Sequence, residues 1–172
     1  MFSQEMTTFE GQHYQVRDLP NLPQPVQQPH PPIHVGGVGE KRTLPLVARY
    51  ADVWNVPTYA LGEIAHKRDV LHAECERIGR DPATIRTSEE AVLVIAPDDA
   101  SVADALAKAE RRFGAPGFGL HEGGYIGTPT AIVDRIGERR ELGITSFVFF
   151  CFDRASEATL RLFADEVMPH FA

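Results

Sequence analysis

The feature that most constrains the fold is a short apolar segment that runs into a cluster of glycines and then into a helical pattern. Residues 33–35 read as a buried strand, and Gly36, Gly37 and Gly39 follow it almost directly. The pattern over residues 40–51 predicts a helix. Such a turn presents free backbone N–H groups and the positive end of a helix at one point, which suits a phosphate group. The alternative is a tight strand-to-helix turn that binds nothing.

From this turn onward, apolar segments alternate with helical patterns. We predict strands at 33–35, 53–56, 91–96 and 147–152, and helices at 40–51, 61–78, 101–113, 129–142 and from residue 156. The strand at 91–96 is apolar throughout, as expected of a strand that is covered on both faces. Helical connections between neighbouring strands are right-handed, which makes the sheet parallel. Four such units form either half of a (β/α)8 barrel or a small open α/β sheet, and periodicity does not separate the two.

Local signals add detail to these elements. Pro45 is tolerable only in the first turn of its helix, or with a kink. The pair Ser101-x-x-Asp104 resembles a capping box and opens the third helix. Residues 114–127 form a long glycine-rich loop, and loops of that length are often functional. The closing helix is expected to turn four apolar side chains inward: Leu160, Phe163, Ala164 and Val167.

The N-terminal part of the chain has a different character. Residues 7–17 predict a β-hairpin that turns at Glu10-Gly11. Residues 18–32 contain six prolines, which rules out a helix or a central strand and favours an extended connector. We therefore expect one domain with three parts: a hairpin over 1–17, a proline-rich connector over 18–31 and β/α units over 32–172.

Composition limits the classes of partner. The chain has 172 residues and a formal net charge of −7, which disfavours nucleic acid because phosphate backbones need a basic face. No apolar run approaches the roughly 18 residues of a membrane span, and the N-terminal residues lack the pattern of a secretory signal. The two cysteines, Cys75 and Cys151, are read as buried, inert thiols rather than a disulfide or a zinc site. Together these features predict a cytoplasmic protein without a metal site.

An ordered set of short motifs carries a resemblance to a known enzyme family. The longest are Phe9-Glu10-Gly11-x-x-Tyr14, Pro31-Pro32-Ile33-x-Val35-Gly36-Gly37-x-Gly39-Glu40-Lys41-Arg42-Thr43-Leu44 and Ala48-Arg49-Tyr50-Ala51-Asp52-x-Trp54-Asn55. With them the chain resembles the bacterial-luciferase-like monooxygenase family, and within it the coenzyme F420-dependent oxidoreductases. That family forms TIM barrels, and this chain is similar to the C-terminal half, roughly strands five to eight. The resemblance therefore favours a partial (β/α)8 barrel over an open sheet.

The resemblance also implies a function and a cofactor. It implies an oxidoreductase that uses coenzyme F420, or alternatively FMN, for hydride transfer or monooxygenation of a small organic substrate. The family's first four strands carry residues that face the reactive ring of the cofactor, so no catalytic residue is assigned in this chain. We expect either a truncated enzyme, a degenerate half barrel or a chain that a partner completes. The alternative function is a non-catalytic half barrel that binds a phosphorylated ligand or only self-associates.

Six residues are implied as the cofactor-binding site, at the ends of two neighbouring strands. They are Gly36, Gly37, Val38, Gly39, Trp54 and Asn55. Trp54 is equally well explained as a core anchor. Glu40 is expected to stabilise the helix dipole rather than to touch a ligand.

Other polar residues are weaker candidates. His34 points into the barrel if its neighbours pack against helices, and we expect it to be buried and hydrogen-bonded. His121, Glu122 and Tyr125 either close over a substrate or belong to an ordinary loop. Asp153, after the last strand, either contacts substrate or caps the closing helix. Unpaired sheet edges and exposed apolar faces predict a homodimer or larger assembly.

Overall fold

The computed structural model describes residues 2–115 and 118–172, and the chain divides into two compact units, Met1–Ile33 and His34–Ala172. The first unit is an antiparallel hairpin of β1 (Met6–Glu10) and β2 (Gln15–Pro20), followed by an irregular segment. The amide of Gly11 donates to the carbonyl of Tyr14 across the turn at 3.0 Å. The predicted hairpin is confirmed, but its second strand continues to Pro20, so the connector begins later than residue 18. A proline is tolerated there because it is the last residue of an edge strand.

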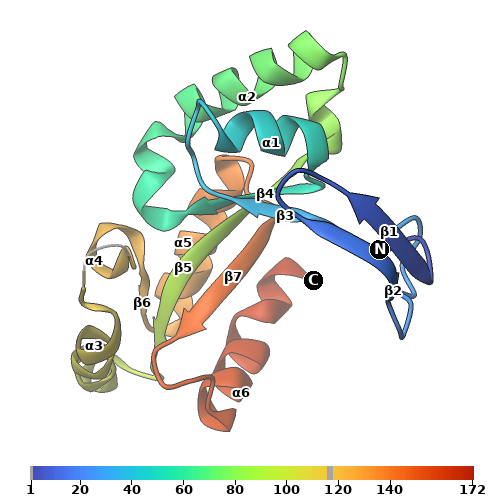
Figure 1. The fold of residues 1–172 in the computed structure, drawn as a ribbon. Helices are drawn as coiled ribbons and strands as arrows, with labels where there is room; N and C mark the ends of the chain where they lie inside the picture. Colours follow the sequence, from blue (N-terminus) through green and yellow to red (C-terminus); the bar gives the residue numbers. More distant parts are fainter. Residues whose placement is uncertain (1, 116–117) are drawn as a thin grey trace. The chain divides into compact units, whose positions relative to one another are not determined.

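The second unit is a parallel sheet with helical connections (Figure 1). Four strands are neighbours in sequence order: β3 (His34–Gly36), β4 (Val53–Pro57), β5 (Arg86–Ile95) and β7 (Ser146–Cys151). The predicted parallel order is confirmed. A short fifth strand, β6 (Tyr125–Gly127), pairs with the end of β5 and lies inside the segment that the sequence predicts as a loop. That segment also holds α4 (Leu120–Gly123), while the part of the predicted loop at residues 116–117 lies outside the described residues.

Strand β5 is longer than predicted because its first half is polar. It begins at Arg86 rather than at residue 91, and Thr87, Ser88 and Glu89 are all buried in it. Buried polar side chains are stable only when they are hydrogen-bonded, and the partners of Ser88 and Glu89 come from other elements. Hydrophobic patterning therefore misses this half of the strand.

Side chains in register across the sheet define its two faces. Val35, Trp54 and Val56 belong to one face, with α1 (Thr43–Tyr50) and α2 (Ile64–Ile78) packed over them. Further along the same face, Ala91, Leu93 and Ile95 are covered by α5 (Pro129–Glu141) and α6 (Glu157–Glu166). We call the opposite side the inner face. It carries His34, Gly36, Val53, Asn55, Pro57, Ser88, Glu90, Val92, Val94, Val148 and Phe150.

Within the described residues, a helix covers the far end of the inner face, and Val53 and Ser88 elsewhere on this face are also buried. Helix α3 (Asp99–Phe113) packs on Val92 and Val94. Val148 and Phe150 on β7 remain 41% and 39% exposed. Short 3-10 segments complete the unit: Thr58–Glu63, Pro82–Thr84 and Met168–Phe171.

Several local predictions are confirmed or corrected. Helix α1 begins at Thr43, which places Pro45 in the first turn, where its missing N–H costs nothing. The residue that caps α3 is Asp98, which accepts from the Ser101 amide at 2.8 Å, so the proposed Ser101 capping box is wrong. In the closing helix Val167 is buried and Phe163 half-buried, but Leu160 and Ala164 are exposed. Helix α6 follows β7, which is a strand at the edge of the sheet. Among the described residues, no neighbouring element packs against the side of α6 that carries Leu160 and Ala164.

Candidate functional site

The glycine turn after β3 lies at the carboxyl edge of the sheet. Gly37 has φ +112°, a conformation that side chains rarely adopt, and its amide donates to the carbonyl of Asn55 at 3.0 Å. The amides of Val38, Gly39 and Glu40 donate to no acceptor in the part of the chain that the structure describes. Gly36 and Gly39 are exposed, and Gly37 and Val38 are half-buried. The turn therefore offers consecutive free N–H donors at the surface, a geometry that binds anions.

Thr43, the first residue of α1, closes this turn from the helix side. A Cβ built on Gly39 would lie 3.1 Å from the Thr43 hydroxyl, and one built on Gly37 would lie 3.4 Å from its methyl group. Thr43 thus makes a tight contact at Gly39 and an ordinary van der Waals contact at Gly37, where the positive φ favours glycine. Its hydroxyl is a further donor beside the free amides.

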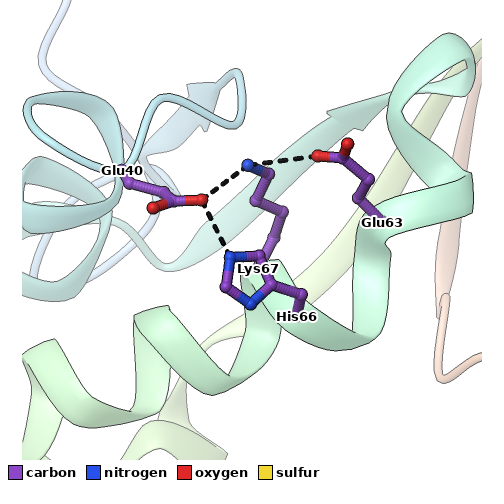
Figure 2. A network of polar contacts seen from close by, with 4 residues as sticks. All are labelled: Glu40, Glu63, His66 and Lys67. Carbon is purple, nitrogen blue, oxygen red and sulfur yellow. Dashed lines mark hydrogen bonds and ion pairs between the residues drawn. The ribbon is translucent and has the colours of Figure 1, made fainter.

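The carboxylate of Glu40 is held by helix α2 (Figure 2). Glu40 Oε1 accepts from Lys67 Nζ at 2.7 Å and lies 3.0 Å from His66 Nε2, while Lys67 also pairs with Glu63 at 3.2 Å. The hydrogen bond from Lys67 is the main reason that the pKa of Glu40 is lowered. Because Lys67 balances its charge, the carboxylate opposes an anion at the turn less than a free one would. The expectation that Glu40 stabilises the dipole of the following helix is wrong, because α1 begins only at Thr43 with no acidic residue in its first turn, and the carboxylate instead contacts α2.

Trp54 supports the turn from inside the core. It is 1% exposed and packs with Leu44, Val47 and Val56 on the helix-covered face. Its indole Nε1 donates to the carbonyl of Gly37 at 2.8 Å. The ring is therefore a core anchor that fixes the turn, and it does not face solvent.

Asn55, the next residue, points to the inner face. Its Oδ1 accepts from Ser88 Oγ at 2.8 Å, and its Nδ2 donates to Glu90 Oε2 at 3.2 Å. A Cβ on Gly36 would lie 3.7 Å from this Nδ2, so the amide lies close beside the turn. The sequence prediction missed Ser88 and Glu90 because the strand was expected to begin at residue 91. The polar run just before the apolar segment was the available signal.

The weaker candidates do not converge on this site. His34 is exposed rather than buried, so the expectation of a hydrogen-bonded core histidine is wrong. Tyr125 is fully buried, whereas His121 is exposed and lies 3.8 Å from Glu110. Asp153 accepts from the amide and hydroxyl of Ser156, the N-cap residue of α6, and from the hydroxyl of Thr159, so it supports the cap of the closing helix.

The two thiols are free. Cys75 is buried and Cys151 half-buried, and burial raises the pKa of both thiols, as expected of inert cysteines.

A second polar cluster lies beneath the helix-covered face. Glu89 is fully buried and accepts from Thr58 Oγ1 at 2.8 Å and from the Tyr125 hydroxyl at 2.6 Å. Arg139 Nε of α5 lies 3.4 Å from the same carboxylate. Burial is the main cause of the raised pKa of Glu89. This cluster joins β5, β6, α5 and the 3-10 segment Thr58–Glu63, and no feature of the sequence analysis indicated it.

A cavity of about 980 Å³ lies elsewhere, between β7, α5 and the C-terminal residues. Its lining is mainly apolar, with Phe147, Phe149 and Phe163 prominent, and it includes none of the predicted site residues. It offers few groups that would orient a polar cofactor. Among the described residues, no helix is long and apolar enough to cross a membrane.

Known structures share this fold. The coenzyme F420 dependent tetrahydromethanopterin reductase from Methanopyrus kandleri is 17% identical, with a TM-score of 0.69 over 96% of this chain and 58% of that one. A monooxygenase from Streptomyces bottropensis is 19% identical, with a TM-score of 0.72 over 99% of this chain and 57% of that one. A riboflavin lyase solved with modified FMN and riboflavin is 16% identical, with a TM-score of 0.66 over 95% of this chain and 47% of that one. The chain thus spans about half the length of these proteins.

The similar structures identify the architecture of this chain, and the match to a family model identifies its family. The four parallel strands with their helices correspond to about half of the TIM barrel of these neighbours, preceded by a short hairpin, as the resemblance implied. The model of the luciferase-like monooxygenases matches residues 1–124, which include the hairpin, the glycine turn, Trp54 and Asn55. The chain belongs to the luciferase-like monooxygenase family.

Proposed function

We propose that this chain forms the half of a flavin- or deazaflavin-dependent oxidoreductase that binds the phosphate-bearing tail of the cofactor. The observation that carries the proposal is the row of free amides at Val38, Gly39 and Glu40, beside Gly37 with its positive φ. Family membership supports an oxidoreductase or monooxygenase, and the neighbours' names support coenzyme F420 or FMN. Coenzyme F420 is our first choice and FMN the alternative.

The residues of the turn fit a phosphate. The free amides would donate to its oxygens and Thr43 would add a hydroxyl, while the Asn55 side chain lies next to this site, beside Gly36. Trp54 would hold the turn in place through the carbonyl of Gly37. When bound, the cofactor would supply the hydride or the oxygen chemistry, while this chain would orient it.

A titration tests the proposal. Purified protein is titrated with coenzyme F420, FMN and riboflavin, and the fluorescence of Trp54, the only tryptophan, is followed. Because Trp54 contacts the turn, binding there should change its emission. We expect coenzyme F420 or FMN to bind at least tenfold more tightly than riboflavin, which lacks the phosphate. Equal affinities for FMN and riboflavin, or no binding of either cofactor, would overturn the proposal.

Gly37→Ala should weaken cofactor binding and lower stability. The substitution forces a side chain into φ +112°, at a cost of about 1–3 kcal/mol in the free energy of unfolding. The displaced turn should lower FMN or coenzyme F420 affinity about tenfold. Gly62→Ala is the control, because no atom lies within 4 Å of the added methyl group. Unfolding and binding curves of Gly37→Ala that match those of the control would contradict the requirement for glycine at this position.

We also propose that the chain forms a homodimer or a larger assembly. In the described residues, β3 and β7 each pair on one side only, and both are parallel strands. A two-fold axis along the strands would therefore join β7 of one copy to β3 of another and cover Val148 and Phe150. Size-exclusion chromatography with light scattering should report at least twice the mass of 19.0 kDa. A well-folded monomer would refute the assembly.

The exposed Val148 and Phe150 also support the alternative function, a non-catalytic half barrel that binds a phosphorylated ligand or only self-associates. Failure of cofactor binding together with a stable oligomer would favour it. We further propose a cytoplasmic location, which the free thiols Cys75 and Cys151 support.

A further inference from the structure

Three polar side chains continue from the glycine turn across the inner face of the sheet. Gly36 is in register with Asn55 on β4, and Asn55 is in register with Ser88 on β5. Glu90 lies two residues further along β5, on the same face. Neighbouring strands are about 4.8 Å apart, so Asn55 lies one strand and Glu90 two strands away from the turn. Polar groups at successive strand spacings suit an extended, polar part of a ligand.

The hydrogen bonds among Asn55, Ser88 and Glu90 determine which of their polar groups remain available to a ligand. A carboxylate only accepts hydrogen bonds, so the end of the Asn55 amide that faces Glu90 at 3.2 Å is the NH2 group. The oxygen of the amide is then satisfied by Ser88 at 2.8 Å. The NH2 group has a second hydrogen, and Glu90 Oε1 has lone pairs, and neither has a partner within the described residues. Asn55 and Glu90 therefore present one donor and one acceptor side by side on the inner face.

This pair selects for hydroxyl groups. Glu90 is half-buried and its carboxylate demands a donor, so it repels a second phosphate and accepts from a neutral hydroxyl. A hydroxyl can also accept from the Asn55 NH2 group. Carboxylates bind the hydroxyls of sugar-like groups in this way in other nucleotide-binding proteins. The covered far end of the face, with Val92 and Val94 under α3, is apolar instead.

We propose that Asn55 and Glu90 bind the ribityl hydroxyls of the cofactor whose phosphate lies on the glycine turn. The inference rests on the proposed function, and it assigns to β5 a binding residue, Glu90, that neither the sequence analysis nor the comparisons single out. Glu90 sets the preference for a polyol linker, while the turn sets the preference for phosphate. Ser88 is a positioning residue, because it acts through Asn55.

The test compares Glu90→Gln with the wild-type chain on three flavins. FMN and riboflavin carry the ribityl chain, and lumiflavin carries a methyl group in its place. The glutamine keeps an acceptor for Asn55 but removes the charge, so we expect FMN and riboflavin to bind about tenfold more weakly and lumiflavin to bind as before. Glu76→Gln, which changes an exposed carboxylate on α2, is the matched control and should change none of the three affinities. Urea unfolding of both variants checks that the fold is retained.

The outcomes separate this inference from the proposed function. If the wild-type chain binds FMN and Glu90→Gln binds it equally well, the polyol assignment is wrong and the phosphate turn stands. A parallel loss for lumiflavin would also reject it, because the effect would then not depend on hydroxyls. If the wild-type chain binds neither FMN nor coenzyme F420, the proposed function fails and this inference fails with it.

Discussion

Replacing Glu89 with leucine should lower the free energy of unfolding by about 3–5 kcal/mol, one of the two largest effects expected of a single substitution in this chain. The carboxylate is fully buried, and its loss would leave the Tyr125 hydroxyl and the Arg139 guanidinium without their partner. Unfolding in urea at neutral pH, followed by circular dichroism, measures the change. Glu138→Leu, on the exposed side of α5, is the control and should change stability by less than about 0.5 kcal/mol.

Glu89→Gln tests the ionisation of the same group. Burial raises the pKa of Glu89 above 4.5, so the folded chain binds this proton more tightly than the unfolded chain. The stabilisation that follows is fully present below pH 4.5 and is lost as the pH rises through the folded-state pKa. The protonated acid is well satisfied, because it can donate to Thr58 Oγ1, which in turn lies 3.0 Å from the carbonyl of Gly123.

The expected result is therefore a stability difference that depends on pH. Wild-type stability relative to Glu89→Gln should fall as the pH rises from 4.5 toward neutrality. Urea titrations of both proteins at several pH values measure it. If the stability of the wild type relative to Glu89→Gln grew with pH instead, the charge of Arg139 would outweigh the effect of burial and lower the pKa of Glu89.

The second large effect is expected at Trp54. Trp54→Ala removes a fully buried ring from the core under α1 and α2 and should cost about 3–5 kcal/mol of unfolding free energy. Tyr59→Ala is the control, because Tyr59 is 54% exposed and its loss should have a small effect. Equal destabilisation by the two changes would mean that Trp54 is not a core anchor.

A more conservative change separates packing from support of the turn. Trp54→Phe keeps an aromatic ring in the core but removes the hydrogen bond from Nε1 to the carbonyl of Gly37. We expect a stability loss nearer 1 kcal/mol than the alanine value, together with weaker binding of FMN or coenzyme F420. Because this variant has no tryptophan, cofactor emission is followed instead. Unchanged affinity would show that the turn holds its geometry without the indole.

The elements that depend on nearby residues could be predicted from the sequence, whereas the contacts between distant residues could not. The apolar runs at 53–56 and 147–152 and the helical spacing from residue 61 place strands and helices correctly, because burial imposes periodicity on nearby residues. The hydrogen bonds of Ser88 and Glu89 join residues more than thirty positions apart, so no local pattern predicts that the strand begins at Arg86. The same holds for the exposure of Leu160, which depends on which elements lie beside α6.

For the candidate site, the glycine spacing after residue 35 sufficed to locate the turn. The positive φ of Gly37 and the start of α1 both depend on residues that lie within ten positions of each other. The roles of Trp54 and Asn55 were not separable from sequence, because adjacent residues of a strand face opposite sides and only packing decides which side is the core. Glu90 could not be recognised at all before its neighbour on β4 was known.

The amino-acid sequence by itself determined the parallel β/α succession and the turn with its unused amides, because chain-local geometry produces both. Only the tertiary structure decided that Trp54 supports this turn from the core, that Asn55 and Glu90 lie on the inner face of the sheet, and that Glu89 is buried beneath α5. The physical reason is that side-chain burial and hydrogen-bond partnership are set by strand register and layer packing, which join distant parts of the chain.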